Sequence, residues 1–326
     1  MVTALTTVPM PTPLTGSAVA AQWRWNPYVI VALLAIAACY LVATTRVREH
    51  WPVNRTVAFL LGLALFGWTT MSFLGVYQQV LFWPRAIQII TLLMVVPLFL
   101  ALGAPVRLAV EGGPRWLAAA IHRLLATRIA ALLTFPAIVS LVFLVTPFTV
   151  YFSPIYEGTL RSRTAAWALS FALTALGFFY YWTRLRLDPV PKEYPHLVSV
   201  WITFAEAIAD GALGLTLMMG HHLVAGDWYN ALNRSWGPTP KQDQVWGGGA
   251  LWLIGDLAGV PFIGALWRRM FTEDRQRAAE VDAELDAQAP FTPASPTPDE
   301  ESQRSRPWWE TDPVLGRRYG FQEETD

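Results

Sequence analysis

The stretch AIQIITLLMVVPLFLALGAPV, residues 86–106, contains no charged side chain and is rich in Leu, Ile and Val. About 20 predominantly apolar residues are enough for an α-helix to cross the hydrocarbon core of a bilayer. Because lipid offers the backbone no hydrogen-bond partner, a crossing segment of this kind is expected to be helical. The stretch therefore predicts a transmembrane helix and places the chain among integral membrane proteins.

The composition of the 326-residue chain fits this class. Hydrophobic residues make up 54% of it and charged residues 15%, whereas soluble domains carry nearer a quarter charged residues. The 16 tryptophans suit membrane interfaces. A formal net charge of zero gives no reason to expect nucleic acid as a partner. The single cysteine, Cys39, excludes a disulfide or a thiolate cluster within one chain.

Six further stretches have the length and apolar character of membrane spans. The fourth contains Pro136 and Pro147, which are expected to kink it. The seven predicted spans are residues 28–45, 57–77, 86–106, 129–152, 165–182, 198–223 and 246–267. The predicted fold is an all-α integral membrane protein, a bundle of seven transmembrane helices.

Basic residues indicate the orientation of this bundle. They concentrate in alternate loops, and the positive-inside rule assigns such loops to the cytoplasm. The N-terminus is therefore expected outside and the C-terminus in the cytoplasm. The cytoplasmic set is Arg46, Arg48, Arg55, Arg107, Arg115, Arg123, Arg128, Arg184, Arg186, Lys192, Arg268, Arg269, Arg275 and Arg277; the smaller outer set is Arg24, Arg85, Arg161, Arg163, Arg234 and Lys241.

Three regions follow from the composition. Residues 1–27 are rich in Pro and Thr and are predicted to be a disordered extracytoplasmic lead. Residues 28–270 form the seven-helix transmembrane domain, and residues 271–326 a cytoplasmic polar tail that is partly helical and then disordered. Near the end of this tail, WWETDPVLGRRYGF (308–321) is either a frayed end or a docking peptide for a partner.

Three acidic residues fall inside predicted spans. Glu206 and Asp210 are four residues apart and share one face of span six, and Asp256 lies at a similar depth in span seven. Acids at membrane depth usually face a bundle interior, a partner or a water-filled cavity. A shared polar cluster is expected, as a packing feature, a proton or cation path, or a remnant of a metal or partner site.

The outer end of span six reads MMGHH. Thioethers suit Cu(I) and imidazoles suit several metals, so Met218, Met219, His221 and His222 are a candidate copper site. On a continuous helix Met218 and His222 share a face, as do Met219 and His222. The alternative is that the methionines pack and the histidines form a polar cap at the headgroup level.

Five segments resemble the bacterial cytochrome c oxidase assembly factor family CtaG. They are VVPLFLALGAPVRLA (95–109), YFSPIYEGTL (151–160), LDPVP (187–191), AGDWY (225–229) and DQVWGGGALWLIGD (243–256). The resemblance implies a seven-span protein of the bacterial cell membrane that helps deliver copper to the catalytic subunit of a haem-copper oxidase. It also implies copper-binding histidines near the outer face.

Those histidines are absent from the matching positions. The implied ligands fall on Arg85 and Ile89, with only Gln88 kept between them, and on Tyr151. Others fall near Ala166, Ser170 and Ala172, and one falls on Asp210. Either a different copper site has formed at MMGHH, or the fold persists without copper; the second interpretation is preferred.

Three functions remain open from the sequence. The first is an assembly or accessory factor for a haem-copper oxidase, acting as a membrane scaffold with reduced or absent copper binding. The second is a copper chaperone that uses Met218 to His222. The third is a proton or ion conductor that uses Glu206, Asp210 and Asp256. An enzyme is not expected, because no nucleophile with a base and no complete metal set can be assembled.

Overall fold

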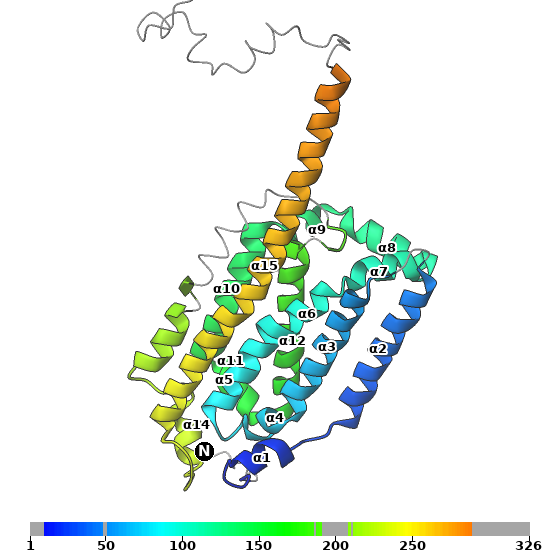
Figure 1. Cartoon of the computed structure of the whole chain (residues 1–326). Helices are drawn as coiled ribbons and strands as arrows, with labels where there is room; N and C mark the ends of the chain where they lie inside the picture. Colours follow the sequence, from blue (N-terminus) through cyan, green and yellow to red (C-terminus); the bar gives the residue numbers. More distant parts are fainter. Residues whose placement is uncertain (1–9, 48–50, 186, 191–207, 210, 289–326) are drawn as a thin grey trace, which may run out of the picture. The chain divides into compact units, whose positions relative to one another are not determined.

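The computed structural model describes residues 10–47, 51–185, 187–190, 208–209 and 211–288, and in this part of the chain the regular secondary structure is entirely helical (Figure 1). Residues 211–219, between α12 and α14, are also helical. The elements are α1 (Gly16–Ala21), α2 (Pro27–Arg46), α3 (Val53–Met71), α4 (Phe73–Tyr77), α5 (Phe82–Ile90), the π-helical turn η1 (Thr91–Val95), α6 (Val96–Leu102), α7 (Pro105–Gly112), α8 (Arg115–Leu125), α9 (Arg128–Leu133), α10 (Pro136–Phe152), α11 (Pro154–Arg161), α12 (Arg163–Leu185), α14 (Gly226–Ala231) and α15 (Pro240–Gln288).

Among the described residues, four helical stretches are long and apolar enough to cross a membrane. They are Pro27–Arg46, Val53–Tyr77, Phe82–Gly112 and Arg163–Leu185, and the pair α10 and α11, bent by 64°, adds a fifth if it forms one span. The predicted spans 28–45, 57–77, 86–106 and 165–182 coincide with the four. Predicted span six, 198–223, lies partly outside the described residues, and predicted span seven, 246–267, is helical within α15.

The fourth predicted span begins later than expected. Residue 129 belongs to the separate helix α9, which ends at Leu133, and α10 starts only at Pro136. Proline has no backbone N–H and disfavours helical geometry in the preceding residue, so Phe135 is extended. Pro147 lies inside α10 without ending it.

The core of the bundle surrounds the line of α5, η1 and α6. Ala86 and Val96 on this line are fully buried, and α3 and α12 both pack against α6. Helix α12 approaches so closely that a Cβ on Gly177 would lie 2.0 Å from the backbone oxygen of Leu93. The π-helical turn directly precedes α6, whose second residue, Pro97, lacks the N–H that a regular hydrogen-bond ladder requires.

The N-terminal segment expected to be a lead contains the short helix α1. The side chain of Thr15 caps it by accepting from the backbone N–H of Ala18. Two long-range bonds involve the same region: Tyr77 donates its hydroxyl to the carbonyl of Thr12 at 2.8 Å, and Arg24 donates its backbone N–H to Met71 at 2.7 Å.

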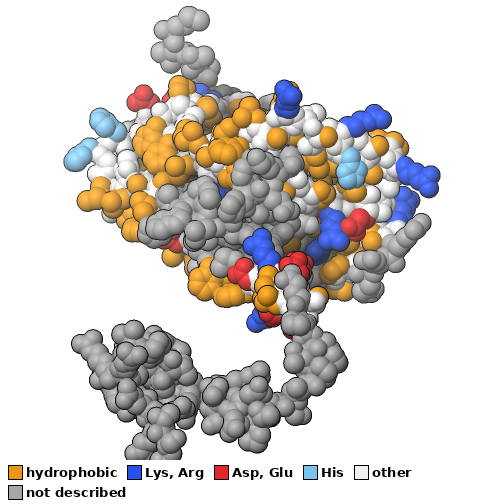
Figure 2. Space-filling model, turned by 90° about the horizontal axis from the view of Figure 1, so that it is seen from above, with side chains coloured by type: hydrophobic (Ala, Val, Ile, Leu, Met, Phe, Trp, Pro, Cys, Tyr) orange, Lys and Arg blue, Asp and Glu red, His pale blue; other side chains and the backbone are white. Residues whose placement is uncertain are grey.

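The chain divides into two compact units, Met1–Met270 and Phe271–Asp326. The described part of the second unit is the last stretch of α15, where residues 281–287 are all exposed. Figure 2 views the first unit from the end that carries α7, α8 and α9, and shows Lys and Arg side chains along its rim. Exposed basic residues there include Arg115, Arg123 and Arg128.

Candidate functional site

A buried arginine lies at the start of the central line of helices. Arg85 on α5 is 2% exposed. Its Nη1 donates to the side-chain oxygens of Gln78 at 2.5 Å and Gln88 at 2.6 Å, and its Nη2 donates to the Thr159 hydroxyl at 2.8 Å. Gln88 in turn donates to the carbonyl of Thr69 at 3.1 Å. The guanidinium thus joins α5 to the end of α4 and to α11.

All three acceptors of this guanidinium are neutral. No carboxylate pairs with Arg85 among the residues described, and its Nε has no hydrogen-bond partner there. A buried charge without a counter-ion is costly unless hydrogen bonds replace its hydration. The arrangement therefore keeps a net positive charge inside the bundle.

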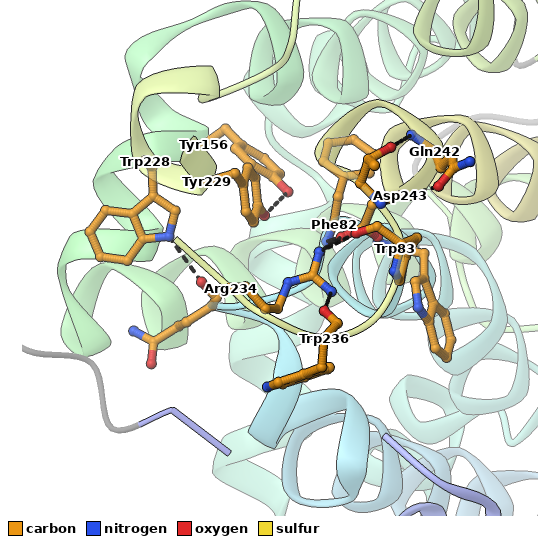
Figure 3. Close-up of polar contacts among 12 residues, drawn as sticks. Phe82, Trp83, Tyr156, Trp228, Tyr229, Arg234, Trp236, Gln242 and Asp243 are labelled. Atoms are coloured by element: carbon orange, nitrogen blue, oxygen red, sulfur yellow. Dashed lines mark hydrogen bonds and ion pairs between the residues drawn. The ribbon is translucent and has the colours of Figure 1, made fainter. Parts of the chain in front are cut away.

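Beside this arginine, two tyrosines connect α11 to α14. The hydroxyls of Tyr156 and Tyr229 are 2.9 Å apart, and both side chains are buried (Figure 3). The indole N–H of Trp228 donates to the carbonyl of Gln79 at 2.9 Å. Burial raises the pKa of Tyr229, so this hydroxyl stays protonated. The AGDWY segment is therefore held to α11 and to the turn after α4.

An ion-paired carboxylate completes the cluster. Asp243 near the start of α15 is 1% exposed and accepts the backbone N–H groups of Phe82 at 3.0 Å and Trp83 at 2.9 Å (Figure 3). These are orphan donors of the first turn of α5, which has no local side-chain cap. Arg234 pairs with Asp243 at 3.4 Å and also donates to the carbonyls of Trp236 and Pro238 at 2.8 Å.

Charge balance at Asp243 results from opposing effects. Burial raises the pKa of its carboxyl, whereas the amides of Trp83 and Phe82 and the charge of Arg234 lower it. Burial likewise lowers the pKa of Arg234, and the nearby Asp243 raises it. The ion pair and its hydrogen bonds connect α5, α15 and the loop before α15.

A second remote carboxylate caps a helix at the other end of the same span. Helix α7 begins after Ala104, which has a left-handed backbone (φ 48°) and provides no side-chain cap. Asp188, in the LDPVP segment, accepts the backbone N–H of Arg107 at 2.6 Å. Burial raises the pKa of Asp188 to about 6, although backbone bonds from Arg107 and Val106 oppose this.

Several positions where the resemblance implies histidines come together in space. Two of them, Ala166 and Ser170, line one cavity together with Gln88, the one residue of the implied motif that this chain keeps. Arg85 contacts two of the glutamines that line it, and Tyr151 and Ile89 are buried nearby in the same core. Ala172 is exposed, and Asp210 lies outside the described residues. The same group of positions includes the buried guanidinium of Arg85.

The MMGHH segment is not one helical face. The helix ends at Met219, and His221 and His222 lie in the bend after Gly220. Met219 is 70% exposed. Lys241 donates its ammonium to the carbonyls of Met218, at 3.1 Å, and Gly220. Among the described residues no group of three or more His, Cys, Asp or Glu side chains is arranged to hold a metal.

The intramembrane acids are only partly described. Glu206 and Asp210 lie outside the described residues, so the predicted cluster with Asp256 stays a prediction. Asp256 itself is exposed on α15.

The segments that contain Asp243, Asp188, Tyr156 and Tyr229 carry the family resemblance, but their sequence predicts no role for these four residues. Their partners lie far away in the chain, so no local spacing reveals them. The available signal was a polar residue within an otherwise apolar, family-like segment.

The apolar helices and their buried polar connections define a polytopic helical membrane protein. The chain belongs to the family of cytochrome c oxidase caa3 assembly factors, Caa3_CtaG, whose model matches residues 38–273.

Similar proteins include uncharacterized proteins of three mycobacteria. Those of Mycobacterium bovis and Mycobacterium tuberculosis are each 27% identical over 292 residues, which cover 85% of this chain and 44% of theirs. That of Mycobacterium leprae is 26% identical over 279 residues, 81% of this chain and 42% of its own. The chain thus spans less than half the length of these relatives. No solved structure matches it.

Proposed function

We propose that this protein is an assembly or accessory factor for a haem-copper cytochrome c oxidase and acts as a membrane scaffold with little or no copper chemistry. Family membership carries the assembly role. The catalytic subunit of the oxidase is the proposed partner, and the bacterial cell membrane the proposed location. Seven spans, with the N-terminus outside, agree with the alternation of basic loops.

The position of Arg85 supports a role without copper. The resemblance places a histidine ligand there, and this chain has a buried guanidinium bonded to Gln78, Gln88 and Thr159. A fixed positive charge in a low-dielectric interior repels a metal cation strongly. The Arg85 network also ties three helical segments together, which suits a rigid scaffold.

The copper-chaperone alternative depends on Met218, Met219, His221 and His222. The Lys241 ammonium donates to two backbone carbonyls at the end of this helix, those of Met218 and Gly220. His221 and His222 lie beyond the end of the helix. The ion-conductor alternative depends on Glu206, Asp210 and Asp256, and the exposure of Asp256 gives it no support. Both therefore rank below the scaffold.

Deletion and complementation test the proposal. Deleting the gene should lower the amount of assembled oxidase, measured by its haem absorption and by the subunits that co-purify. Wild-type protein and a His221→Ala, His222→Ala double variant should restore the oxidase equally. Unchanged oxidase after deletion would exclude the assembly role.

Metal analysis separates the alternatives. Purified wild-type protein and the same double variant should contain equal, near-zero amounts of copper after loading with Cu(I) and desalting. A stoichiometric copper ion in the wild type that the double variant loses would favour the chaperone.

A further inference from the structure

A cavity lined by both polar and aromatic side chains lies where the starts of α2 and α12 meet the end of α4. It has a volume of about 300 Å³. Its polar lining includes Arg24, Asn26, Gln78, Gln88, Arg163 and Ser170. Trp25, Tyr28 and Trp167 add aromatic surface to it. Among the described residues that line it there is no Asp or Glu, so this part of the lining carries a net positive charge.

Neither of its two arginines is neutralised. The side chains of Arg24 and Arg163 make no ion pair or hydrogen bond within the described part of the chain. Burial lowers the pKa of Arg24, and the positive charge of Arg163 lowers it further. Two guanidiniums that face one cavity without a carboxylate repel each other. An anion between them would remove this repulsion.

A third positive charge, that of Arg85, lies directly behind two residues of the cavity lining. Gln78 and Gln88 line the cavity, and both accept hydrogen bonds from Arg85. These bonds orient the amide oxygens toward Arg85, which leaves the amide N–H groups as the donors of the two glutamines. Gln88 uses a donor on Thr69, and Gln78 uses one on Gly75.

Two long helices also begin at this cavity. Helix α2 starts at Pro27 after its cap Asn26, and α12 starts at Arg163. The N-terminal end of a helix carries a partial positive charge and favours anions. Both ends therefore add to the charge of the arginines.

We propose that this cavity binds a single phosphate oxyanion, which Arg24 and Arg163 clamp from two sides. Guanidinium groups match the geometry of phosphate oxygens and form charge-assisted hydrogen bonds with them. The phosphate comes from a lipid headgroup or from free phosphate. The lipid source suits the surroundings, because the exposed rings of Trp25 and Tyr28 border the cavity at the end of a membrane-spanning helix. This binding is independent of the assembly role.

Binding to full-length, delipidated protein in dodecyl maltoside tests the proposal, since this detergent contains no phosphate. Isothermal titration uses three probes: inorganic phosphate, dihexanoyl phosphatidylglycerol, and dihexanoylglycerol, which lacks the phosphate. Saturable binding of either phosphate probe is expected, with no binding of dihexanoylglycerol. Binding of phosphatidylglycerol alone assigns the lipid source, and binding of inorganic phosphate assigns the free anion.

Variants then locate the site. An Arg24→Gln, Arg163→Gln double variant should bind at least about tenfold more weakly, because charge-assisted bonds are lost. Arg161→Gln is the matched control: this exposed arginine lies two residues from Arg163 but is paired with Glu157, so binding should not change. Should the double variant fail to fold, Ala166→Glu places a carboxylate in the cavity lining and should abolish binding.

Three results would overturn the proposal. The first is that neither phosphate probe binds the wild type. The second is equal binding of dihexanoylglycerol, which would show an apolar site. The third is equal weakening by Arg161→Gln, which would show a general charge effect.

Discussion

The carboxylate of Asp243 lies 2.9 Å from the backbone N–H of Trp83, although 160 positions separate the two residues in the chain. The same side chain also accepts the N–H of Phe82. A residue of the last long helix therefore provides the N-terminal cap of α5, whose own preceding residue, Leu81, provides none. These hydrogen bonds join the Asp243 side chain of α15 to backbone amides of α5. Repacking of apolar side chains between the two helices cannot replace them.

Replacing Asp243 should destabilise the bundle. Asp243→Ala removes a helix cap and leaves Arg234 without its carboxylate in a largely buried place, so we expect a loss of about 2–4 kcal/mol in the free energy of unfolding. Thermal unfolding in detergent measures it. Asp227→Ala is the control, since Asp227 is an exposed acid in the first turn of α14. Equal losses for the two variants would contradict the remote cap.

The Tyr156 and Tyr229 hydroxyls should be energetically coupled. Each single change to Phe breaks their 2.9 Å bond and leaves a buried hydroxyl without that partner. A double-mutant cycle should therefore give a coupling energy of about 1 kcal/mol. Tyr28→Phe is the control, because Tyr28 is 85% exposed. Strictly additive single effects would show that the bond contributes nothing.

Gly177 should tolerate no side chain. A Cβ there would lie 2.0 Å from the oxygen of Leu93 and 2.6 Å from the ring of Pro97, so Gly177→Ala must push α12 away from the central helix line. We expect a destabilisation of about 1–3 kcal/mol. Gly158→Ala on α11 meets nothing within 4 Å and should be neutral or stabilise by about 0.4–1 kcal/mol. Chemical denaturation of both variants compares them.

Asp188 should make stability depend on pH in an unusual direction. Its pKa is about 6 in the folded protein against 3.8 for the free side chain. The folded state holds this proton more tightly, so the stabilisation it provides is fully present below about pH 4 and is lost as pH rises through 6. The change is about 3 kcal/mol. Asp188→Asn should flatten the Tm profile between pH 4 and 6, and an unchanged profile in this variant would contradict the role of Asp188.

Arg85 should not be replaceable by lysine. Its two terminal nitrogens donate to Gln78, Gln88 and Thr159 at once, and a single ammonium nitrogen, which lacks the planar fork of the guanidinium, cannot reach all three. Arg85→Lys is therefore expected to cost about 2–4 kcal/mol of folding free energy. Arg115→Lys, an exposed change on α8, should cost almost nothing in the same unfolding assay.

The length of the apolar stretches, together with the residues that begin or end helices, made part of the fold predictable from the sequence. The first span, expected over 28–45, is helix α2 from Pro27 to Arg46, with Asn26 and Pro27 marking its start. The fourth was expected from residue 129 but starts at Pro136, because the proline ends the preceding helix instead of kinking it. Hydropathy alone does not distinguish these two outcomes.

The candidate site was less predictable, since it depends on partners remote in the chain. Nothing near Asp243 indicates that it caps α5, and nothing near Arg85 indicates Thr159 as a partner. The MMGHH segment shows the opposite problem. Its spacing suggested a shared helical face for Met218 and His222, but the helix ends before the histidines.

The remote cap on α5 also has a consequence for biosynthesis. When Phe82 and Trp83 are added to the nascent chain, Asp243 is still about 160 residues from being translated, which corresponds to roughly 8–30 s at typical elongation rates. During that interval the amides of Phe82 and Trp83 have no carboxylate to bind. A nascent chain truncated before α15 would lack this carboxylate altogether, so the start of α5 would keep two uncapped amides.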